Sequence, residues 1–288
     1  MRQIWVALLC LAFCGLALAD GPGAVRKRAE ASMLVTGWVV VAPDGHVQSH
    51  ELNKQEQLPP EVVDLIRRST VNWRFEPVML DGKPVAAKAK MSLRVVAKRE
   101  DGGDNFAARV AGATFGEPGA ADPVTYKNGG APKYPEQAMR GRVSGTVYLL
   151  VRVDRSGKVA DVAAEQVNLE VVDSDKRMQA WRGVLADASI KAARKWTYNV
   201  PTSGPHANDD SWIIRVPIAY HMLEAGQSDA DNYGRWQTYI PGPKEPVPWL
   251  SKYPQANDDK GNATDALADN GLHMVGSGIR LMTPLDHS

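Results

Sequence analysis

Cysteine is nearly absent from this chain. Its 288 residues include two cysteines, Cys10 and Cys14, and both lie in the apolar stretch at the N-terminus. If that stretch is removed on export, the remaining chain can form no disulfide and has no thiolate for catalysis or for metal binding. We therefore expect hydrophobic cores alone to hold the fold together.

The chain also lacks an excess of charge of either sign. Its 34 Lys and Arg residues offset 33 Asp and Glu residues, for a formal net charge of +1, so there is no bulk electrostatic case for binding nucleic acid. Common catalytic motifs are missing from the sequence, which has no Gly-x-Ser-x-Gly, Ser-x-x-Lys or His-Glu-x-x-His. His46 and His50 would lie about 13 Å apart along an expected strand, too far to share one ion. We expect a protein that is not an enzyme and that uses no metal or cofactor.

Residues 1–19 are typical of an export signal. Arg2 supplies the charged start, residues 4–18 are almost all apolar, and Ala17-Leu18-Ala19 forms a small-x-small cleavage site ahead of Asp20. The apolar run is short for a membrane-spanning helix, which needs about 20 residues. We predict export to a Gram-negative periplasm with cleavage after Ala19. An uncleaved signal, which would anchor the chain in the inner membrane and give its only membrane contact, is the alternative.

Two stretches of the chain share one order of expected elements: a hairpin, a helix, a short strand with the pattern Trp-x-aromatic, and a long closing strand. In the first stretch the hairpin turns at Pro43-Asp44-Gly45, and the short strand carries Trp73-Arg74-Phe75. In the second stretch the hairpin turns at Asp154-Arg155-Ser156-Gly157, and the short strand carries Trp196-Thr197-Tyr198. Turn glycines between alternating apolar strands favour hairpins in both places. A repeated order predicts two α+β modules of one kind.

Six residues of these stretches are expected to be structural. The glycines belong to turns and to the Gly-x-Val starts of strands, and the tryptophans are core anchors on strands. These residues are Gly37, Gly45, Trp73, Gly145, Gly157 and Trp196.

Shifts in composition predict the domain boundaries. The stretches between the modules are rich in Gly, Ala, Asp and Pro and show no periodicity, which favours irregular structure. The expected parts are a signal peptide (1–19), a leader (20–32), a first module (33–98), a linker (99–128), a second module (129–223) and an extended or disordered C-terminal tail (224–288).

The second stretch resembles the C-terminal domain of TonB-family energy transducers. The resemblance covers roughly residues 130–223 and rests on four motifs in a fixed order: Pro132-x-Tyr134-Pro135-x-x-Ala138, Gly145-x-Val147, Asp154-x-x-Gly157-x-Val159 and Trp196-x-Tyr198. The first stretch is a looser match. It has Gly37-Trp38-Val39 and Trp73-x-Phe75 but no Tyr-Pro motif, so it looks like a degenerate copy of the same module.

This resemblance implies an α+β domain with an antiparallel sheet and helices on one face. It also implies binding to an outer-membrane TonB-dependent receptor, one segment of which adds as an extra strand to the sheet edge. By analogy the edge would be the last strand, 211–222, and the receptor-facing start of the domain would lie at its Tyr-Pro motif. The partner-binding residues implied are Tyr134, Pro135, Ser211, Trp212, Ile213, Ile214, Arg215 and Val216.

The chain departs from a full transducer in ways that leave three functions open. Residues 20–32 are far too few to cross the periplasm, at about 3.3 Å each when extended, and the N-terminal apolar stretch lacks the His of the family's anchor. The first hypothesis is a periplasmic protein that binds a receptor or another periplasmic partner and assists TonB-dependent transport. The second is a structural protein whose sheet edges pair within the chain or in a homodimer. The third is a membrane-anchored transducer with an uncleaved signal.

Overall fold

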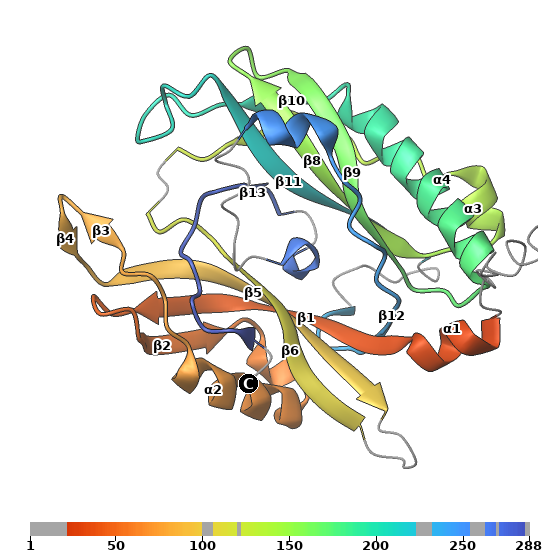
Figure 1. Cartoon of the computed structure of the whole chain (residues 1–288), viewed down its shortest axis with the longest axis horizontal. Coiled ribbons are helices and arrows are strands. Elements are labelled where there is room, and N and C mark those ends of the chain that lie inside the picture. The colour runs from red at the N-terminus through yellow and green to blue at the C-terminus, as the bar shows by residue number, and fades with distance from the viewer. Residues whose placement is uncertain are drawn as a thin grey trace, which may run out of the picture.

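The first sheet is organised around one long strand, β1 (Glu30–Val41). The computed structural model describes residues 22–99, 106–119, 122–222, 232–253, 263–268 and 271–285, and it places these in two antiparallel sheet bodies (Figure 1). In the first, the strand order is β12-β1-β5-β6, with β2 also beside β1. The bounds of the partners are Val47–Leu52 for β2, Ala87–Arg99 for β5, Phe106–Phe115 for β6 and Gln237–Tyr239 for β12.

Helix α2 (Pro60–Asn72) covers one face of this first sheet. Pro60 occupies the first helical turn, where a missing N–H costs nothing, and Val62, Leu65 and Ile66 of the helix are buried against the strands. Smaller elements complete the body. They are the 3-10 turn η1 (Gln55–Gln57) and the short hairpin of β3 (Met79–Leu80) and β4 (Lys83–Pro84).

The second sheet has the order β13-β11-β8-β9. Helix α4 (Asp175–Ala193) and the short helix α3 (Glu136–Arg140) pack on one face of it. This agrees with the expected α+β architecture of an antiparallel sheet with helices on one face. The strands are β8 (Gly145–Asp154), β9 (Val159–Leu169), β11 (Ser211–Tyr220) and β13 (His273–Met274), and β7 (Thr125–Asn128) pairs separately with β10 (Thr197–Asn199).

The two bodies connect their central strands in the same way. In the first, β1 pairs with its hairpin partner β2 and with the closing strand β5, and in the second, β8 pairs with β9 and with β11. The Trp-x-aromatic segment meets the hairpin turn identically in both. Phe75 donates its N–H to the Gly45 carbonyl at 2.7 Å, and Tyr198 donates to the Gly157 carbonyl at 2.7 Å.

The six residues expected to be structural lie at tightly packed positions. Gly45 and Gly157 have φ values of 87° and 78°, in the left-handed region that glycine enters without steric cost. A Cβ on Gly37 would lie 2.1 Å from the Glu51 carbonyl oxygen, and one on Gly145 would lie 2.3 Å from that of Asn168. The two tryptophans, Trp73 and Trp196, are buried in the two cores.

The predicted linker over 99–128 is wrong in its middle, because β6 spans Phe106–Phe115 and pairs with β5 over its whole length. Its Ala and Gly residues have low strand propensity on their own. The edge of β5 supplies the missing stabilisation, and Val110 and Phe115 at the inner end are fully buried. Long-range pairing therefore overrides the local composition.

The leader also differs from its prediction. Helix α1 (Pro22–Arg28) precedes β1, which begins at Glu30. Val25 of α1 is buried in the core of the second body, although it precedes the first body in the sequence. The leader expected at 20–32 is therefore regular structure from Pro22 onward, apart from Ala29 between the helix and the strand. Residues 1–21, including the predicted signal peptide, lie outside the described residues.

The predicted extended or disordered tail over 224–288 is wrong for most of its described part. The segment carries β12 and β13 and the 3-10 turns η3 (Pro248–Lys252) and η5 (Thr264–Ala266). Its many Gly and Pro residues prevent long regular elements but do not prevent burial. Ile240 is buried in the core of the second body, and Ile279 and Leu281 are buried in that of the first. Figure 1 shows this segment, in blue, running across both bodies.

Replacing Gly157 by Ala should destabilise the protein more than replacing Gly204 by Ala. Both glycines have positive φ, 78° and 80°, so each alanine costs about 1–2 kcal/mol in the left-handed region. Only at Gly157 would the new Cβ meet backbone, 2.2 Å from the Tyr198 carbonyl oxygen, whereas nothing lies within 4 Å at Gly204. We expect an additional cost of at least about 1 kcal/mol for Gly157→Ala, measured by urea unfolding. Equal losses would show that the hairpin turn and the Tyr198 strand are not tightly docked.

Candidate functional site

The outer side of β11 is the edge that the sequence pointed to, and a strand from the C-terminal segment already pairs with it. Ile214 is opposite Met274 and Arg215 is opposite His273. The Val275 N–H donates to the Ile213 carbonyl at 2.8 Å. The expectation that the last strand of the second module is an unpaired edge is therefore wrong at these residues. The strand that covers them lies more than 50 residues further along the chain.

Beyond Arg215, no strand of the described chain pairs with the outer side of β11. In an antiparallel strand the N–H and C=O of one residue point to the same side, and neighbours alternate. Because the backbone of Ile213 bonds on the outer side, the backbone groups of Arg215, Pro217 and Ala219 also point to the outer side. Pro217 has no N–H to offer, and its position on the outer side is where a strand proline costs no ladder bond to β8. The outer side of β11 is thus paired with β13 at one part and lacks an N–H donor at Pro217.

Side chains of β11 alternate between two apolar environments. Trp212, Ile214 and Val216 belong to the core beneath the helices. Ile213 faces the opposite side, where it packs with Leu150 and Val275 in a small separate cluster. Four residues of the C-terminal segment cover this cluster, namely Val247, Trp249, Leu250 and Tyr253. Both faces of the second sheet are therefore covered, one by helices and the other by irregular chain.

A buried ion pair ties β11 to β9 on this second face. The guanidinium of Arg215 meets the carboxylate of Glu165 through two contacts, Nε to Oε2 at 2.7 Å and Nη2 to Oε1 at 3.2 Å. The two side chains are only 6% and 12% exposed. A bidentate, desolvated pair of this kind is strongly directional, so it fixes the register and position of Arg215, one of the residues implied in partner binding.

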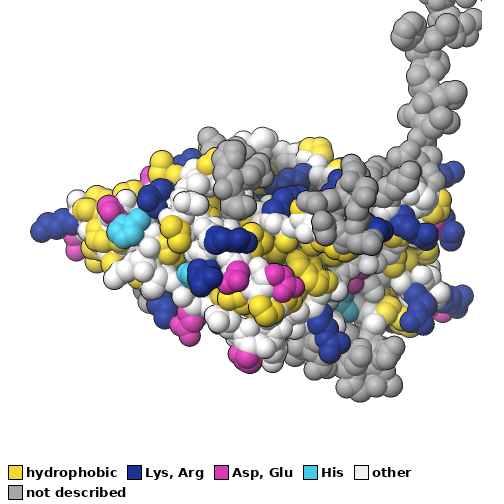
Figure 2. Space-filling model, turned by 90° about the horizontal axis from the view of Figure 1, so that it is seen from below, with side chains coloured by type: hydrophobic (Ala, Val, Ile, Leu, Met, Phe, Trp, Pro, Cys, Tyr) yellow, Lys and Arg dark blue, Asp and Glu magenta, His cyan; other side chains and the backbone are white. Residues whose placement is uncertain are grey.

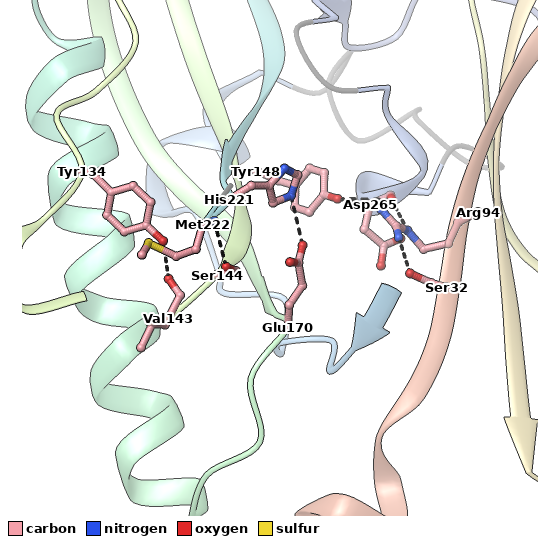
Figure 3. A network of polar contacts seen from close by, with 10 residues as sticks. All are labelled: Ser32, Arg94, Tyr134, Val143, Ser144, Tyr148, Glu170, His221, Met222 and Asp265. Atoms are coloured by element: carbon pink, nitrogen blue, oxygen red, sulfur yellow. Dashed lines mark hydrogen bonds and ion pairs between the residues drawn. The ribbon is translucent and has the colours of Figure 1, made fainter. Parts of the chain in front are cut away.

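Tyr134 and Pro135 lie at the other end of β11 from the Ile213–Arg215 segment. Pro135 is the residue before α3, and the Tyr134 hydroxyl donates to the Val143 carbonyl at 2.7 Å (Figure 3). The Tyr134 ring is edge-on to Tyr220, with centroids 5.3 Å apart, and burial raises the pKa of its hydroxyl. Tyr220 is five residues from Arg215, which is about 17 Å along a strand. The two groups of implied partner-binding residues therefore lie apart.

The opposite edge of the second sheet, β9, is open over a short stretch. Leu169 exchanges hydrogen bonds with Ile240 at 2.9 and 3.1 Å, and the Glu245 N–H donates to the Glu165 carbonyl at 2.8 Å. Between Val159 and Ala164, no backbone group of the described chain bonds to the outer side of β9. Local sequence patterns do not single out this edge, because the residues that pair with the rest of β9 lie in the C-terminal segment.

A polar network joins the two sheets, and sequence reasoning missed it. The Asp265 carboxylate in η5 accepts hydrogen bonds from Asn168 at 3.1 Å, Gln166 at 3.4 Å and the Tyr239 hydroxyl. Its backbone carbonyl accepts from Arg94 at 2.5 Å and from the Tyr148 hydroxyl at 3.3 Å. Figure 3 shows Arg94 and Tyr148 pointing toward Asp265 from the two sheets.

The protonation state of Tyr239 follows from this network. Burial, together with the neighbouring Asp265 carboxylate, raises the pKa of Tyr239 far above its usual range. The hydroxyl therefore stays protonated at neutral pH and serves as a donor. A sequence signal for part of the network did exist. Arg94 interrupts the apolar run Leu93-Arg94-Val95-Val96, and a charge inside such a strand needs a buried partner.

A small cavity beside the network has room for about one water molecule. It is lined by residues of both bodies, including Ser32, Arg94, Tyr148 and Tyr239, and His221 lies at it with its ring nitrogen 3.1 Å from Glu170. These groups already bond to one another, and the cavity is too small for an organic substrate. Within the part of the chain that the structure describes, no three His, Cys, Asp or Glu side chains are arranged to hold a metal ion.

The surface seen in Figure 2 mixes charge signs. Lys and Arg side chains are scattered over this face among acidic and apolar ones. Such a face suits contact with protein rather than long-range steering of a polyanion. As for the membrane, none of the helices in the described ranges is both long and apolar enough to span one.

Comparison with known proteins places a family domain on the second body. The family described as Gram-negative bacterial TonB protein C-terminal matches residues 130–222. Protein TonB of Xanthomonas campestris pv. campestris strain B100 is 35% identical over 105 residues, which are 36% of this chain and 40% of that protein. Protein tonB2 of Pseudomonas aeruginosa is 30% identical over 97 residues, 34% of this chain and 31% of that protein. No solved structure matches the chain.

These matches confirm the resemblance for the second body, which carries a TonB C-terminal domain of a non-enzymatic family. They do not extend to the first body, for which only the shared connectivity described above is seen. The chain spans about 40% of the length of the Xanthomonas relatives.

Removing Glu165 should be far more costly than removing an exposed partner. Glu165→Ala leaves the Arg215 guanidinium buried without its carboxylate, which costs about 3–5 kcal/mol in such pairs. The control is Glu136→Ala, which breaks the i,i+4 contact with Arg140 on the surface of α3 and should cost less than about 1 kcal/mol. Both losses are measured by chemical unfolding. Losses of similar size would mean that the Arg215 pair is solvated.

Proposed function

We propose that this chain binds an extended segment of an outer-membrane TonB-dependent receptor. The premise is the TonB C-terminal domain at residues 130–222. The segment would add as a strand to the outer side of β11, and the chain would assist TonB-dependent energy transduction. Another periplasmic protein that offers an extended segment is the alternative partner. The proposed contact residues are Ser211, Trp212, Ile213, Ile214, Arg215 and Val216, with Tyr134 and Pro135 at the far end of the strand.

One observation carries the proposal. β11 has ten residues, and all ten pair with β8, whereas on its outer side only two residues pair with β13. A long strand with a short outer ladder presents N–H and C=O groups that an extended peptide can use. The family match supports the choice of body, since it covers β8, β9, α4 and β11 and leaves the first body out.

A second candidate function has its own support. Strands from the C-terminal segment lie along both sheets, with β12 on β1 and β13 on β11, and Ile240 pairs with Leu169 of β9. Sheet edges used inside the chain are what a structural periplasmic protein would need. In that case the open stretch of β9, Val159–Ala164, would remain for pairing with a second copy.

Receptor capture with edge-specific proline variants tests the proposal. The exported chain, immobilised, should retain a TonB-dependent receptor from outer-membrane extract, identified by mass spectrometry. Ala219→Pro removes an outward N–H of β11 and should lower capture at least tenfold. Ala164→Pro on the outer side of β9 is the matched control, expected to leave capture unchanged. Loss of receptor capture with Ala164→Pro alone would place the receptor-binding edge at β9. Recovery of the chain alone, as a dimer in size-exclusion chromatography, would favour the structural function.

The proposed location is the periplasm, and the N-terminus of the exported protein tests it. Cleavage of the predicted signal leaves a chain that begins at Asp20, and intact-mass measurement on protein from the cell envelope should find that species. A chain that retains residues 1–19 and sediments with inner membranes would instead support the membrane-anchored transducer.

A further inference from the structure

The segment that pairs with β11 is short, and the chain is fixed on both sides of it. On one side it follows η5, where Asp265 bonds to Asn168, Gln166 and Tyr239. On the other side Leu281 forms a bridge with Phe75. The pairing strand between these anchor points has only two residue pairs with β11. The contacts of Asp265 and Leu281 do not involve this strand, so its release from β11 need not break them.

The pairing segment ends in a turn directly after its contact with β11. Gly276 has a φ of 82°, a backbone conformation that favours glycine. The Ser277 hydroxyl donates to the Met274 carbonyl at 2.7 Å. The hydrogen bond from Val275 to Ile213 is thus followed by a turn away from β11, which limits the occupied part of the edge to Ile213–Arg215.

Side chains of this segment alternate as those of a bound peptide strand would. Leu272 and Met274 pack against the core beneath the helices. Val275 points to the opposite face and packs with Ile213 and Leu150. His273 lies opposite Arg215, whose charge is already matched by Glu165. The residues of this segment therefore indicate which residue types can pair with β11 at each position.

We infer that residues 272–275 are a resident strand which a partner segment must displace from β11, and that their pattern describes the partner. The partner segment is extended and apolar at two alternate positions that face the helix-side core. On the other face it has an apolar residue opposite Ile213 and a polar, non-acidic residue opposite Arg215. This inference rests on the proposed function, because it concerns the same edge. Being tethered, the resident strand competes at a high effective concentration, so it lowers the apparent affinity for the partner.

A reversible lock on the resident strand tests this inference. Ile214 and Met274 form a cross-strand pair that is not hydrogen-bonded, since Ile213 bonds outward. The Cα atoms of such a pair lie about 4.5 Å apart, within the range that a disulfide spans. The double variant Ile214→Cys/Met274→Cys carries no other cysteine once residues 1–19 are removed. Oxidation holds the strand on β11, and reduction releases it.

The first readout needs no receptor. A fluorescent peptide with the sequence of residues 271–277, Gly-Leu-His-Met-Val-Gly-Ser, is titrated against the full exported chain and followed by anisotropy. The reduced double variant should bind it at least tenfold more tightly than the oxidised form. The two single variants should show no response to reductant. Equal binding by both forms, or no binding by the reduced form, overturns the inference.

Two proline variants add a test that does not depend on cysteine. Val275→Pro removes the N–H that bonds to Ile213, so it should open the edge and raise peptide binding at least tenfold over the unmodified chain. Met274→Pro is the matched control on the same segment, because the N–H of Met274 points away from β11. Unfolding midpoints within a few degrees of the unmodified chain show that both variants are folded. Equal effects of the two prolines would contradict a role for the ladder bond.

The second readout separates this inference from the proposed function. Receptor capture from outer-membrane extract is repeated with the oxidised and reduced double variant. Capture by the reduced form alone supports both the displaced strand and the proposed function. Equal capture by both forms overturns the displaced strand and leaves receptor binding at another edge. Absence of capture in both forms, with peptide binding that still responds to reductant, supports the resident strand and contradicts the proposed function.

Discussion

Asp265 joins three parts of the chain that are distant in the sequence. Its carboxylate accepts hydrogen bonds from Asn168 of the second sheet and from Tyr239 of the C-terminal segment, and its backbone carbonyl accepts from Arg94 of the first sheet. Hydrogen bonds of this kind gain strength in a buried setting, and they are costly to break because the groups left behind are desolvated. The position of η5 is thereby fixed between the two sheets (Figure 3). The course of everything that follows it, including the strand on β11, depends on that fixed point.

The cores can do without disulfides because the C-terminal segment contributes to both of them. It supplies Ile279 and Leu281 to the core of the first body and Ile240 to that of the second. Each buried aliphatic side chain contributes about 1.5–3 kcal/mol. The same segment covers sheet edges that would otherwise invite pairing with other chains. One irregular stretch of chain therefore serves both stability and protection against edge-to-edge association.

Local signals in the sequence were enough for the hairpin and the helix of each body and for the short strand that follows Trp196. After Trp73 the expected short strand is reduced to isolated bridges at Arg74 and Phe75. Gly45 and Gly157 indicate turns because few other residues tolerate their φ values, and Trp73 and Trp196 indicate buried positions. The strand β6 and the C-terminal segment could not be predicted, since their stability comes from partners far away in the sequence. For the candidate site, the sequence indicated β11 but not the strand that covers part of it. Pro217 was visible in the sequence, yet its meaning depends on knowing which side of β11 it faces.

The closing strands of the two bodies show why the second body is the better candidate for partner binding. β5 and β11 hold equivalent places, each beside the central strand of its sheet. The outer side of β5 pairs with β6 over nine residue pairs, and β6 follows it directly in the chain. The outer side of β11 pairs with β13 over two residue pairs, supplied by a segment more than 50 residues away. Exchange of a nine-pair ladder would break most of the pairing at that edge of the first sheet, whereas exchange of a two-pair ladder breaks few hydrogen bonds. The first body is therefore suited to act as a scaffold, and the edge with the short ladder belongs to the body that matches the TonB C-terminal family.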